Sequence, residues 1–353
     1  MKNILYITAL ICSIGASCSA QNLNPKKEYD QVCVGFYNLE NLFDTIVDPD
    51  TNKILQDDFT PDGKKHFNTE RYYEKLGNLS KVIADLGTEE TSDGPAVLGV
   101  CEIENRQVLE DLVAMPLIKD RNYQIVQFDS PDKRGIDVAF LYQSKYFTMT
   151  DSYVATLKDP ENPDFFTRDQ LVVSGTIDNE EFHFIIAHWP SRRGGAEKSE
   201  PKRLLAASLA KKLIEDVQAN SPDAKIIYMG DLNDDPTNAS LKDVLLTEGD
   251  IDEVEEDELY NPMESIFANG TGSLEWRGDW FLFDQFLCTS NLIDAKNKFN
   301  TYSFLRAEVH DVALLRQATG KYQGTPFRTY GGSKWLGGFS DHFPVYMFIA
   351  KAK

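Results

Sequence analysis

The chain has 353 residues, of which 42% are hydrophobic, 11% aromatic and 26% charged. These proportions exclude a disordered, collagenous or coiled-coil protein and predict a globular protein with a large core. Acidic residues outnumber basic residues by 56 to 36, and the resulting net charge of −20 excludes a protein that coats nucleic acid nonspecifically.

The first predicted element is an export signal at residues 1–20. A basic residue is followed by an apolar run from Ile4 to Ile14, which is shorter than the ~20 residues of a membrane-spanning helix. The sequence favours cleavage after Ala20 over lipidation of Cys18, because the lipoprotein motif before Cys18 is weak. We therefore expect a periplasmic or extracellular protein, or one anchored to the outer membrane through Cys18, with residues 21–353 forming a single mature domain.

Short apolar, β-branched runs in the rest of the chain predict strands. They are Val32–Tyr37, Ala96–Cys101, Tyr123–Phe128, Ile136–Tyr142, Leu171–Ile177, Phe182–Ala187, Lys225–Met229, Phe281–Cys288 and Phe343–Ile349. Amphipathic patterns predict one helix from Thr69 to the residue before Gly87 and another opening at Ser199. Many strands and few long helices favour an α/β fold, a four-layer sandwich of two packed mixed β-sheets flanked by helices.

Polar side chains cluster next to five of these strands, where α/β scaffolds present functional sites. The clusters are Asn38–Asn41, Glu102, His188–Ser191, Gly230–Pro236 and Ser340–His342. A single strand-terminal Asp or Asn more often caps a turn, and a single His is more often structural. The recurrence of the pattern is what indicates a site.

The residue types in these clusters favour a divalent cation. Asp231 and Asn233 are two residues apart, so their side chains point the same way in extended backbone. Further oxygen donors stand at Asn38, Glu40, Glu102 and Asp341. The five cysteines form no CxxC pair, so Mg²⁺, Mn²⁺ or Ca²⁺ is favoured over zinc. His188 and His342 add side chains that exchange protons near neutral pH.

Basic residues near these clusters are candidates for binding substrate phosphate. Arg192 and Arg193 follow His188 directly, and Arg134 precedes a predicted strand. The alternative is that they are solvent-facing arginines on a flexible loop. The aromatic and basic run Phe327–Tyr330, together with Trp335, forms either a surface for stacking nucleobases or sugars, or a packed loop.

The sequence resembles a known family at these positions. The resemblance rests on the motifs YNLENLFD, CEIEN, AHWP, GDLNDDP, FDQFL and SDHFPV. They occur in the order and rough spacing of the endonuclease/exonuclease/phosphatase superfamily, metal-dependent phosphodiesterases that include pancreatic-type deoxyribonuclease and abasic-site endonucleases. The resemblance spans about residues 31–350, and YNLENLFD looks most like the secreted bacterial nucleases.

The resemblance implies a role for each matching residue. Metal-site residues are implied at Asn38, Glu102 and, in a position often held by Asp, Glu40. Residues that bind metal or orient water and phosphate are implied at Asp231, Asn233 and Asp341. An acid/base pair is implied at His188 and His342, with Asp284 orienting the second histidine. A phosphate contact is implied at Arg168, where a guanidinium fork suits bidentate binding.

Our leading hypothesis is a secreted nuclease that hydrolyses DNA or RNA phosphodiester bonds with a divalent metal, Mg²⁺ first. One alternative is the same chemistry on a small or lipid phosphoester, as in sphingomyelinases, for which an acidic charge is no handicap. Another is an inactive surface binding protein, which is disfavoured because every expected catalytic position holds a competent residue. We expect a monomer without an obligate protein partner.

Overall fold

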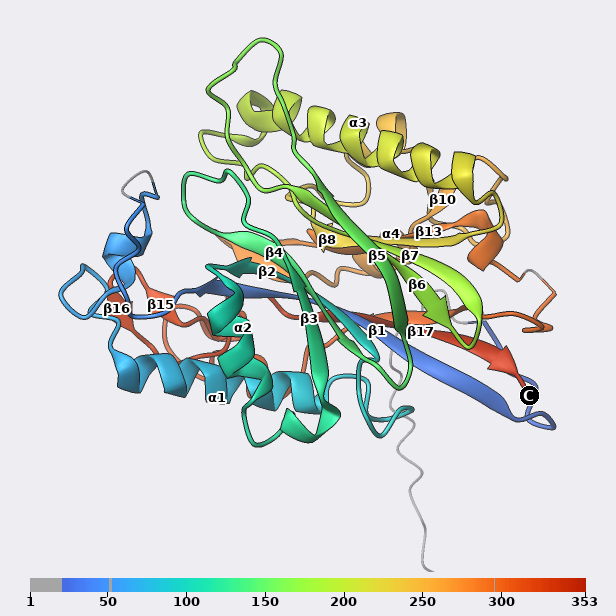
Figure 1. Ribbon diagram of the computed structural model, residues 1–353, viewed down its shortest axis with the longest axis horizontal. Helices are drawn as coiled ribbons and strands as arrows, with labels where there is room; N and C mark the ends of the chain where they lie inside the picture. The colour runs from blue at the N-terminus through green and yellow to red at the C-terminus, as the bar shows by residue number, and fades with distance from the viewer. Residues whose placement is uncertain (1–20, 51–52, 295) are drawn as a thin grey trace, which may run out of the picture.

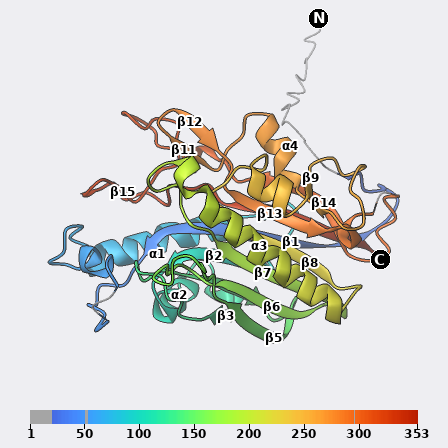
Figure 2. The same ribbon diagram turned by 90° about the horizontal axis from the view of Figure 1, so that it is seen from above.

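The computed structural model describes residues 21–50, 53–294 and 296–353, so the predicted signal at 1–20, with Cys18, lies outside the described residues. Two β-sheets packed face to face form its centre (Figures 1 and 2). The six-stranded sheet has the order β14 (Ser303–Val309), β17 (Val345–Ala352), β1 (Tyr29–Leu42), β2 (Val97–Ile103), β4 (Asp137–Gln143) and β3 (Tyr123–Gln127). The seven-stranded sheet has the order β5 (Thr148–Ala155), β6 (Gln170–Ile177), β7 (Glu180–His188), β8 (Lys225–Asp231), β13 (Asp284–Thr289), β10 (Leu259–Tyr260) and β9 (Thr247–Glu248).

Both sheets are mixed. Strand β1 is parallel to β2 and antiparallel to β17, while β8 is parallel to β7 and antiparallel to β13. Two small hairpins accompany them, β11 (Leu274–Trp276) with β12 (Asp279–Phe281) and β15 (Tyr330–Gly331) with β16 (Lys334–Trp335). Strand β5 was not predicted because it is an edge strand with a largely exposed, polar sequence, TMTDSYVA, that lacks an apolar stripe.

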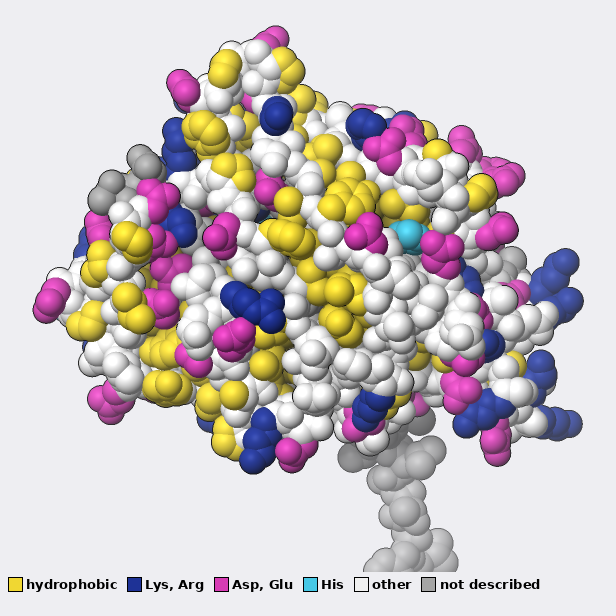
Figure 3. Space-filling model, in the orientation of Figure 1, with side chains coloured by type: hydrophobic (Ala, Val, Ile, Leu, Met, Phe, Trp, Pro, Cys, Tyr) yellow, Lys and Arg dark blue, Asp and Glu magenta, His cyan; other side chains and the backbone are white. Residues whose placement is uncertain are grey.

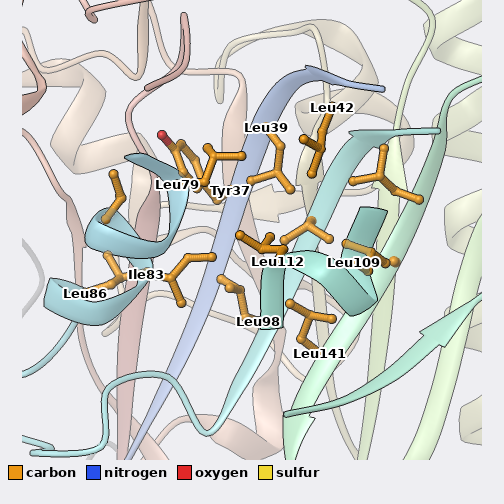
Figure 4. Packing of buried hydrophobic residues seen from close by; sticks show 14 of the residues in the cluster. Tyr37, Leu39, Leu42, Leu79, Ile83, Leu86, Leu98, Leu109, Leu112 and Leu141 are labelled. Atoms are coloured by element: carbon orange, nitrogen blue, oxygen red, sulfur yellow. The ribbon is translucent and has the colours of Figure 1, made fainter. Parts of the chain in front are cut away.

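Helices cover the outer faces of the two sheets, which confirms the predicted four-layer sandwich. Helices α1 (Thr69–Asp85) and α2 (Arg106–Val113) pack on the first sheet, as Figure 4 shows for Ile83 and Leu112. Helix α3 (Ala196–Asn220) packs on the second sheet, and the short helix α4 (Pro262–Ala268) contributes to the core between the sheets. Among the described residues, none of the helices combines the length and apolar character that crossing a membrane requires.

The helix boundaries follow local capping chemistry. Helix α1 begins at Thr69 as predicted, because the side chain of Asn68 accepts a hydrogen bond from the backbone nitrogen of Arg71 at 3.0 Å. Helix α3 begins at Ala196, one turn before the predicted start at Ser199, whose hydroxyl donates to the carbonyl of Gly195 inside the first turn. The prediction assigned Ser199 as a cap, whereas the helix had already begun.

The long apolar run of β1 is explained by burial on both of its faces. Val34 and Phe36 point into the core between the sheets, while Tyr37 and Leu39 pack under α1. Alternate side chains of a strand face opposite sides of the sheet, so both sets must be apolar here. The rigid strand then delivers the polar residues that follow it to the edge of the sandwich.

Candidate active site

The predicted strand-end residues meet at one edge of the sandwich. They stand in or next to the central strands, as Asn38 (β1), Glu102 (β2), His188 (β7), Asp231 (β8), Asp284 (β13) and His342 (before β17). In the second sheet, Asp231 is the direct register partner of both His188 and Asp284. Because β7 and β8 end where the antiparallel β13 begins, the sheet itself brings these residues together.

Asp231 lies at the centre of the group. Its Oδ2 accepts a hydrogen bond from Nδ2 of Asn38 at 3.0 Å and lies 3.6 Å from Nε2 of His188 and 3.9 Å from Nε2 of His342. Its Oδ1 accepts from the backbone nitrogen of Asn233 at 3.1 Å. Burial raises the pKa of Asp231 to about 6; His342 opposes this effect, and the nearby carboxylates of Asp284 and Glu102 add to it. Asp231 is therefore close to its titration range at neutral pH.

The two histidines are held in opposite charge states. Burial alone would lower the pKa of His342, but the carboxylates of Asp284 and Asp231 outweigh burial and raise it well above its ordinary value. Burial lowers the pKa of His188 well below its ordinary value, and the guanidinium groups of Arg168 and Arg134 add to that effect. The opposite directions of these pKa shifts favour the imidazolium form of His342 and the neutral form of His188.

Left-handed backbone conformations shape the edge around Glu102. Glu40, Asn41 and Glu102 have φ values of 48°, 52° and 60°, and the β1–β2 register shifts between Asn38 and Leu42. Such conformations are uncommon for residues other than glycine, and they cluster at functional sites. This bulge lets the backbone nitrogen of Asn41 donate to Oε2 of Glu102 at 2.9 Å. This hydrogen bond fixes Oε2 of Glu102 and leaves Oε1 facing His188 and Arg134.

Glu40 does not join the group around Asp231, which differs from its predicted role as a metal ligand. Its carboxylate accepts hydrogen bonds from the backbone nitrogens of Thr329 at 2.5 Å and Tyr330 at 3.3 Å. Burial and the charge of Asp341 raise the pKa of Glu40 to about 7, while the buried Lys75 opposes this rise. The reversed backbone at Glu40 turns its side chain toward this neighbouring loop, where it anchors structure.

Lys75 is a buried residue that sequence reasoning missed. It is 1% exposed, and its Nζ donates to the hydroxyl of Thr329 at 2.6 Å. It faces the charges of Glu40 and the half-buried Asp341. The helical period places Lys75 on the buried face of α1. Its neighbours in the sequence do not show that it lies opposite the carboxylates of Glu40 in β1 and Asp341 before β17.

The side chains of Arg168 and Arg134 lie beside the group of residues around Asp231. Arg168 is buried and donates to Oδ2 of Asp132 at 3.0 Å and to the carbonyl of Trp189 at 2.5 Å. Arg134 lies 3.6 Å from both Glu102 Oε1 and Asp132 Oδ1. Among the described residues, Nη2 of Arg134 and Nε of Arg168 have no hydrogen-bond partner. Asp132, which sequence reasoning did not single out, thus positions both cations.

Arg192 is a structural residue, which differs from its predicted role in binding substrate. Its guanidinium donates to the carbonyl of Asn233 and to the side chains of Asp234, Asp235 and Asn238 at 2.9–3.2 Å. It also stacks on the Phe283 ring, with its central carbon 4.5 Å from the centroid. These contacts engage Nε and Nη2 of the guanidinium and place two carboxylates beside its charge. Arg192 fastens the loop after β8.

Arg193, by contrast, is exposed and lines a cavity of about 460 Å³ next to the group around Asp231. Arg134 and Arg168 form the inner wall of this cavity, and Lys133 and Lys202 contribute further positive charge. On the face shown in Figure 3, by comparison, charges of both signs are interspersed. A locally basic cavity beside buried acid/base residues suits an anionic group such as a phosphate.

The donor set fits a divalent cation held by oxygen. Glu102 and Asp231 offer carboxylates, and the Asn233 amide nitrogen donates to the Trp189 carbonyl at 3.0 Å, which leaves the amide oxygen for a ligand. The charges of neighbouring carboxylates raise the pKa of Asp231, and a bound cation would relieve that crowding. Cys101 offers a sulfur close to His188 and Asp231, but burial raises its thiol pKa well above the ordinary value. That thiol stays protonated and is a poor ligand.

Several solved structures share this fold over nearly their whole length. D. rerio TDP2 complexed with single-strand DNA product has a TM-score of 0.52 and 14% identity, over 90% of this chain and 98% of that one. The Bacteroides thetaiotaomicron mannosyl-6-phosphatase has a TM-score of 0.52 and 15% identity, over 90% and 99%. The human Nocturnin catalytic domain with bound sulfate has a TM-score of 0.52 and 14% identity, over 93% and 98%.

A sequence comparison with curated proteins gave no match. The model of the endonuclease/exonuclease/phosphatase family, however, matches residues 33–351, which include every residue of the group around Asp231. The match agrees with the two mixed sheets and with the motifs at their common edge. The chain therefore belongs to the endonuclease/exonuclease/phosphatase family and is a hydrolase of phosphoester bonds.

Proposed function

We propose that the protein is an exported, divalent-metal-dependent phosphodiesterase that cleaves DNA or RNA by attack of water. The observation that carries this proposal is the position of Asp231 between two histidines of opposite charge state, beside a basic cavity. This arrangement supplies a proton acceptor, a proton donor and phosphate-binding cations at one place. Export of residues 21–353 is supported by the signal-like sequence of residues 1–20.

The residues of the chain divide the work of in-line hydrolysis. Asp231, with a pKa of about 6, is placed to orient the attacking water and accept its proton. As an imidazolium, His342 carries protons on both ring nitrogens: Nδ1–H faces Oδ2 of Asp284 at 2.7 Å, and Nε2–H is left to donate to a phosphoryl or leaving oxygen. Neutral His188 is placed to donate one hydrogen bond to a non-bridging oxygen. Arg134 and Arg168 position the phosphate by charge.

A divalent cation held by Glu102, with Asn38 and Asp231 close by, would supply Lewis-acid stabilisation of the charge that develops on the phosphate. Mg²⁺ is the first candidate and Mn²⁺ the second, since the donors are carboxylate and amide oxygens. Ca²⁺ would bind the same donor types. The Asn38 amide is held at both ends, since its oxygen accepts from the backbone nitrogen of Glu40 at 2.9 Å and its nitrogen donates to Oδ2 of Asp231 at 3.0 Å. In this state Asn38 orients the Asp231 carboxylate, and its oxygen would bind a cation through its second lone pair.

The alternative substrate is a small or lipid phosphoester. The net charge of −20 favours it, because the chain offers no diffuse attraction to a polyanion. A similarly folded structure is titled a mannosyl-6-phosphatase, whereas another holds a single-strand DNA product. Local basic residues at the cavity offset the global charge, and we therefore place nucleic acid first.

The experiment that tests the proposal incubates purified residues 21–353 with plasmid DNA, RNA, an aryl phosphodiester and an aryl phosphomonoester. Each substrate is tested with Mg²⁺, Mn²⁺, Ca²⁺ or a chelator, and Asp231→Asn serves as the inactive control. We expect metal-dependent cleavage of a polymer and of the phosphodiester, with polymer cleavage falling as monovalent salt is added. Cleavage of the phosphomonoester alone would instead establish the small-substrate alternative.

A further inference from the structure

A second cavity, of about 810 Å³, lies between the β11–β12 hairpin and the loop 316–328. Its wall combines exposed aromatic rings, Trp276 and Tyr322, with the cations Arg277, Lys321 and Arg328. No acidic residue other than Glu275 lines it, and an oxygen of Glu275 accepts the backbone N–H of Gly278. This composition contrasts with the acidic chain as a whole.

Three of the four cations of this cavity lack an ion pair among the described residues. Within the part of the chain that the structure describes, no ion pair is formed by Arg277, Lys321 or Arg328, and Nε of Arg328 lacks a hydrogen-bond partner. Each cation instead lies over an aromatic ring: Arg277 is 5.6 Å from Trp276, and Lys321 and Arg328 are 5.3 and 5.4 Å from Tyr322. Arg316, which also borders the cavity, is different because Asp311 neutralises it. Uncompensated cations gathered in a cavity favour an anionic ligand.

The backbone presents these side chains on rigid supports. Trp276 pairs with Asp279 across the hairpin, and the two residues between them, Arg277 and Gly278, have φ values of 59° and 98°. A two-residue loop with both φ values positive is the tight turn that matches strand twist. It holds the Trp276 ring, which is 59% exposed, away from the core. An exposed indole fixed in this way is suited to stacking on a planar ring.

The cavity is linked to the group around Asp231 through the segments next to His342 and Asp284. The Trp280 ring stacks on Phe343, the residue after His342, with centroids 6.0 Å apart. Strand β12 also continues through two residues into Asp284, the partner of His342. The wall of the cavity is therefore connected, through Trp280 and through β12, to the two segments that hold His342 and Asp284.

We propose that this cavity is a subsite for a nucleotide neighbouring the scissile phosphate, with Trp276 stacking on its base and Arg328 and Arg277 binding its phosphate. The proposal rests on the proposed nuclease function and specifies its substrate class, a single-stranded polynucleotide with accessible bases. In a paired duplex, stacking within the helix would compete with Trp276 for the base. For Phe327–Tyr330 and Trp335 the sequence allowed either a stacking surface or a packed loop. The structure packs Phe327, Tyr330 and Trp335 against the core and leaves Arg328 at the cavity.

The test measures binding separately from cleavage. The full mature chain, in chelator, is titrated with a labelled single-stranded oligothymidylate and with an abasic oligomer of the same length and charge, and fluorescence anisotropy is recorded. Trp276→Ala should weaken oligothymidylate binding about tenfold, the scale of one stacked base, and leave abasic binding nearly unchanged. Arg328→Ala should weaken both. Trp276→Tyr should restore most of the affinity for oligothymidylate.

The matched controls are Tyr153→Ala, an exposed aromatic on β5 that is 39% accessible, and Lys119→Ala, an exposed lysine after α2. Both should bind as the wild type does. Equal affinity of the wild type for the two oligomers, or wild-type binding by Trp276→Ala and Arg328→Ala, would overturn the subsite. The nuclease proposal is judged separately, by cleavage of the same oligothymidylate by the wild type with added metal. Base-dependent binding, with no cleavage of the oligothymidylate, of plasmid DNA or of RNA, would leave a nucleotide-binding cavity and remove the nuclease function.

Discussion

The Nδ1 atom of His342 lies 2.7 Å from Oδ2 of Asp284, a residue 58 positions earlier in the chain. The same oxygen accepts the hydroxyl of Ser273 at 2.5 Å, so the carboxylate is fixed from two sides. Asp284 is fully buried, and its other oxygen has no partner among the described residues. This geometry fixes both the orientation and the charge of the His342 ring.

Replacing Asp284 with Asn should lower kcat by about 10²-fold or more, the usual scale of acid/base catalysis. The Asp284 carboxylate helps to raise the pKa of His342, so its loss lowers that pKa. The high-pH limb of the pH–rate profile, which reports the protonated ring, should then move to lower pH. Profiles of kcat/KM on an aryl phosphodiester check this. Ser273→Ala, which keeps the carboxylate, should shift the limb less, and an unmoved limb in Asp284→Asn would contradict the role of His342 as the acid.

Removal of divalent metal should abolish activity, and Glu102→Gln should lower kcat by orders of magnitude and raise the metal concentration needed for half activity. In chelator, the Glu102→Gln variant should melt at or above the wild-type temperature, because one of the crowded charges that raise the pKa of Asp231 has gone. Both effects are measured on the wild type and on Glu102→Gln, by activity as a function of metal concentration and by thermal melts in chelator. Full activity at negligible metal content would refute the metal-dependent mechanism.

Arg134 and Arg192 should separate a binding role from a structural one. Arg134→Ala should raise KM for phosphodiester substrates, because it removes a cation with a free Nη2 from the wall of the cavity. Arg192→Ala should instead destabilise the fold by about 1–3 kcal/mol, because Asp234 and Asp235 each lose a hydrogen-bond donor, while Arg203 and the backbone nitrogen of Leu282 still hold them. Denaturant melts and steady-state kinetics on both variants provide the comparison. The reverse pattern would return Arg192 to substrate binding.

Glu104 should make stability depend on pH. Its side chain is buried and accepts the backbone nitrogen of Asp44 at 2.8 Å, and burial raises its pKa to about 7. The unfolded value is about 4.3, so the stability that the protonated folded form contributes is present below about pH 4 and is lost as the pH rises toward 7. Glu104→Gln keeps the acceptor oxygen without the charge. The variant should match the wild type near the lower pH and melt higher at about pH 8, whereas a pH-independent difference would contradict the assignment.

The sequence by itself determined the central strands of both sheets and the residue types at the edge where they end. Strands such as β1 are buried on both faces, so their apolar runs are visible without knowledge of their partners. A polar residue directly after a buried apolar strand is costly to place unless it has a function or caps a turn. Asn38, Glu102, His188 and Asp231 were identified because they stand at such positions. The motifs also carried the family resemblance, because catalytic chemistry restricts residue type at each of these positions.

Only the tertiary structure decided how individual side chains are used. Arg192 and Arg193 are adjacent and identical in type, yet the carboxylates of Asp234 and Asp235 neutralise the first and leave the second at the cavity. Glu40 turns to the backbone of Thr329 because of a left-handed φ at a bulge, which no propensity marks. Whether a charged side chain is paired within the fold or left to bind a ligand depends on its neighbours in space, and residues distant in the sequence supply those neighbours.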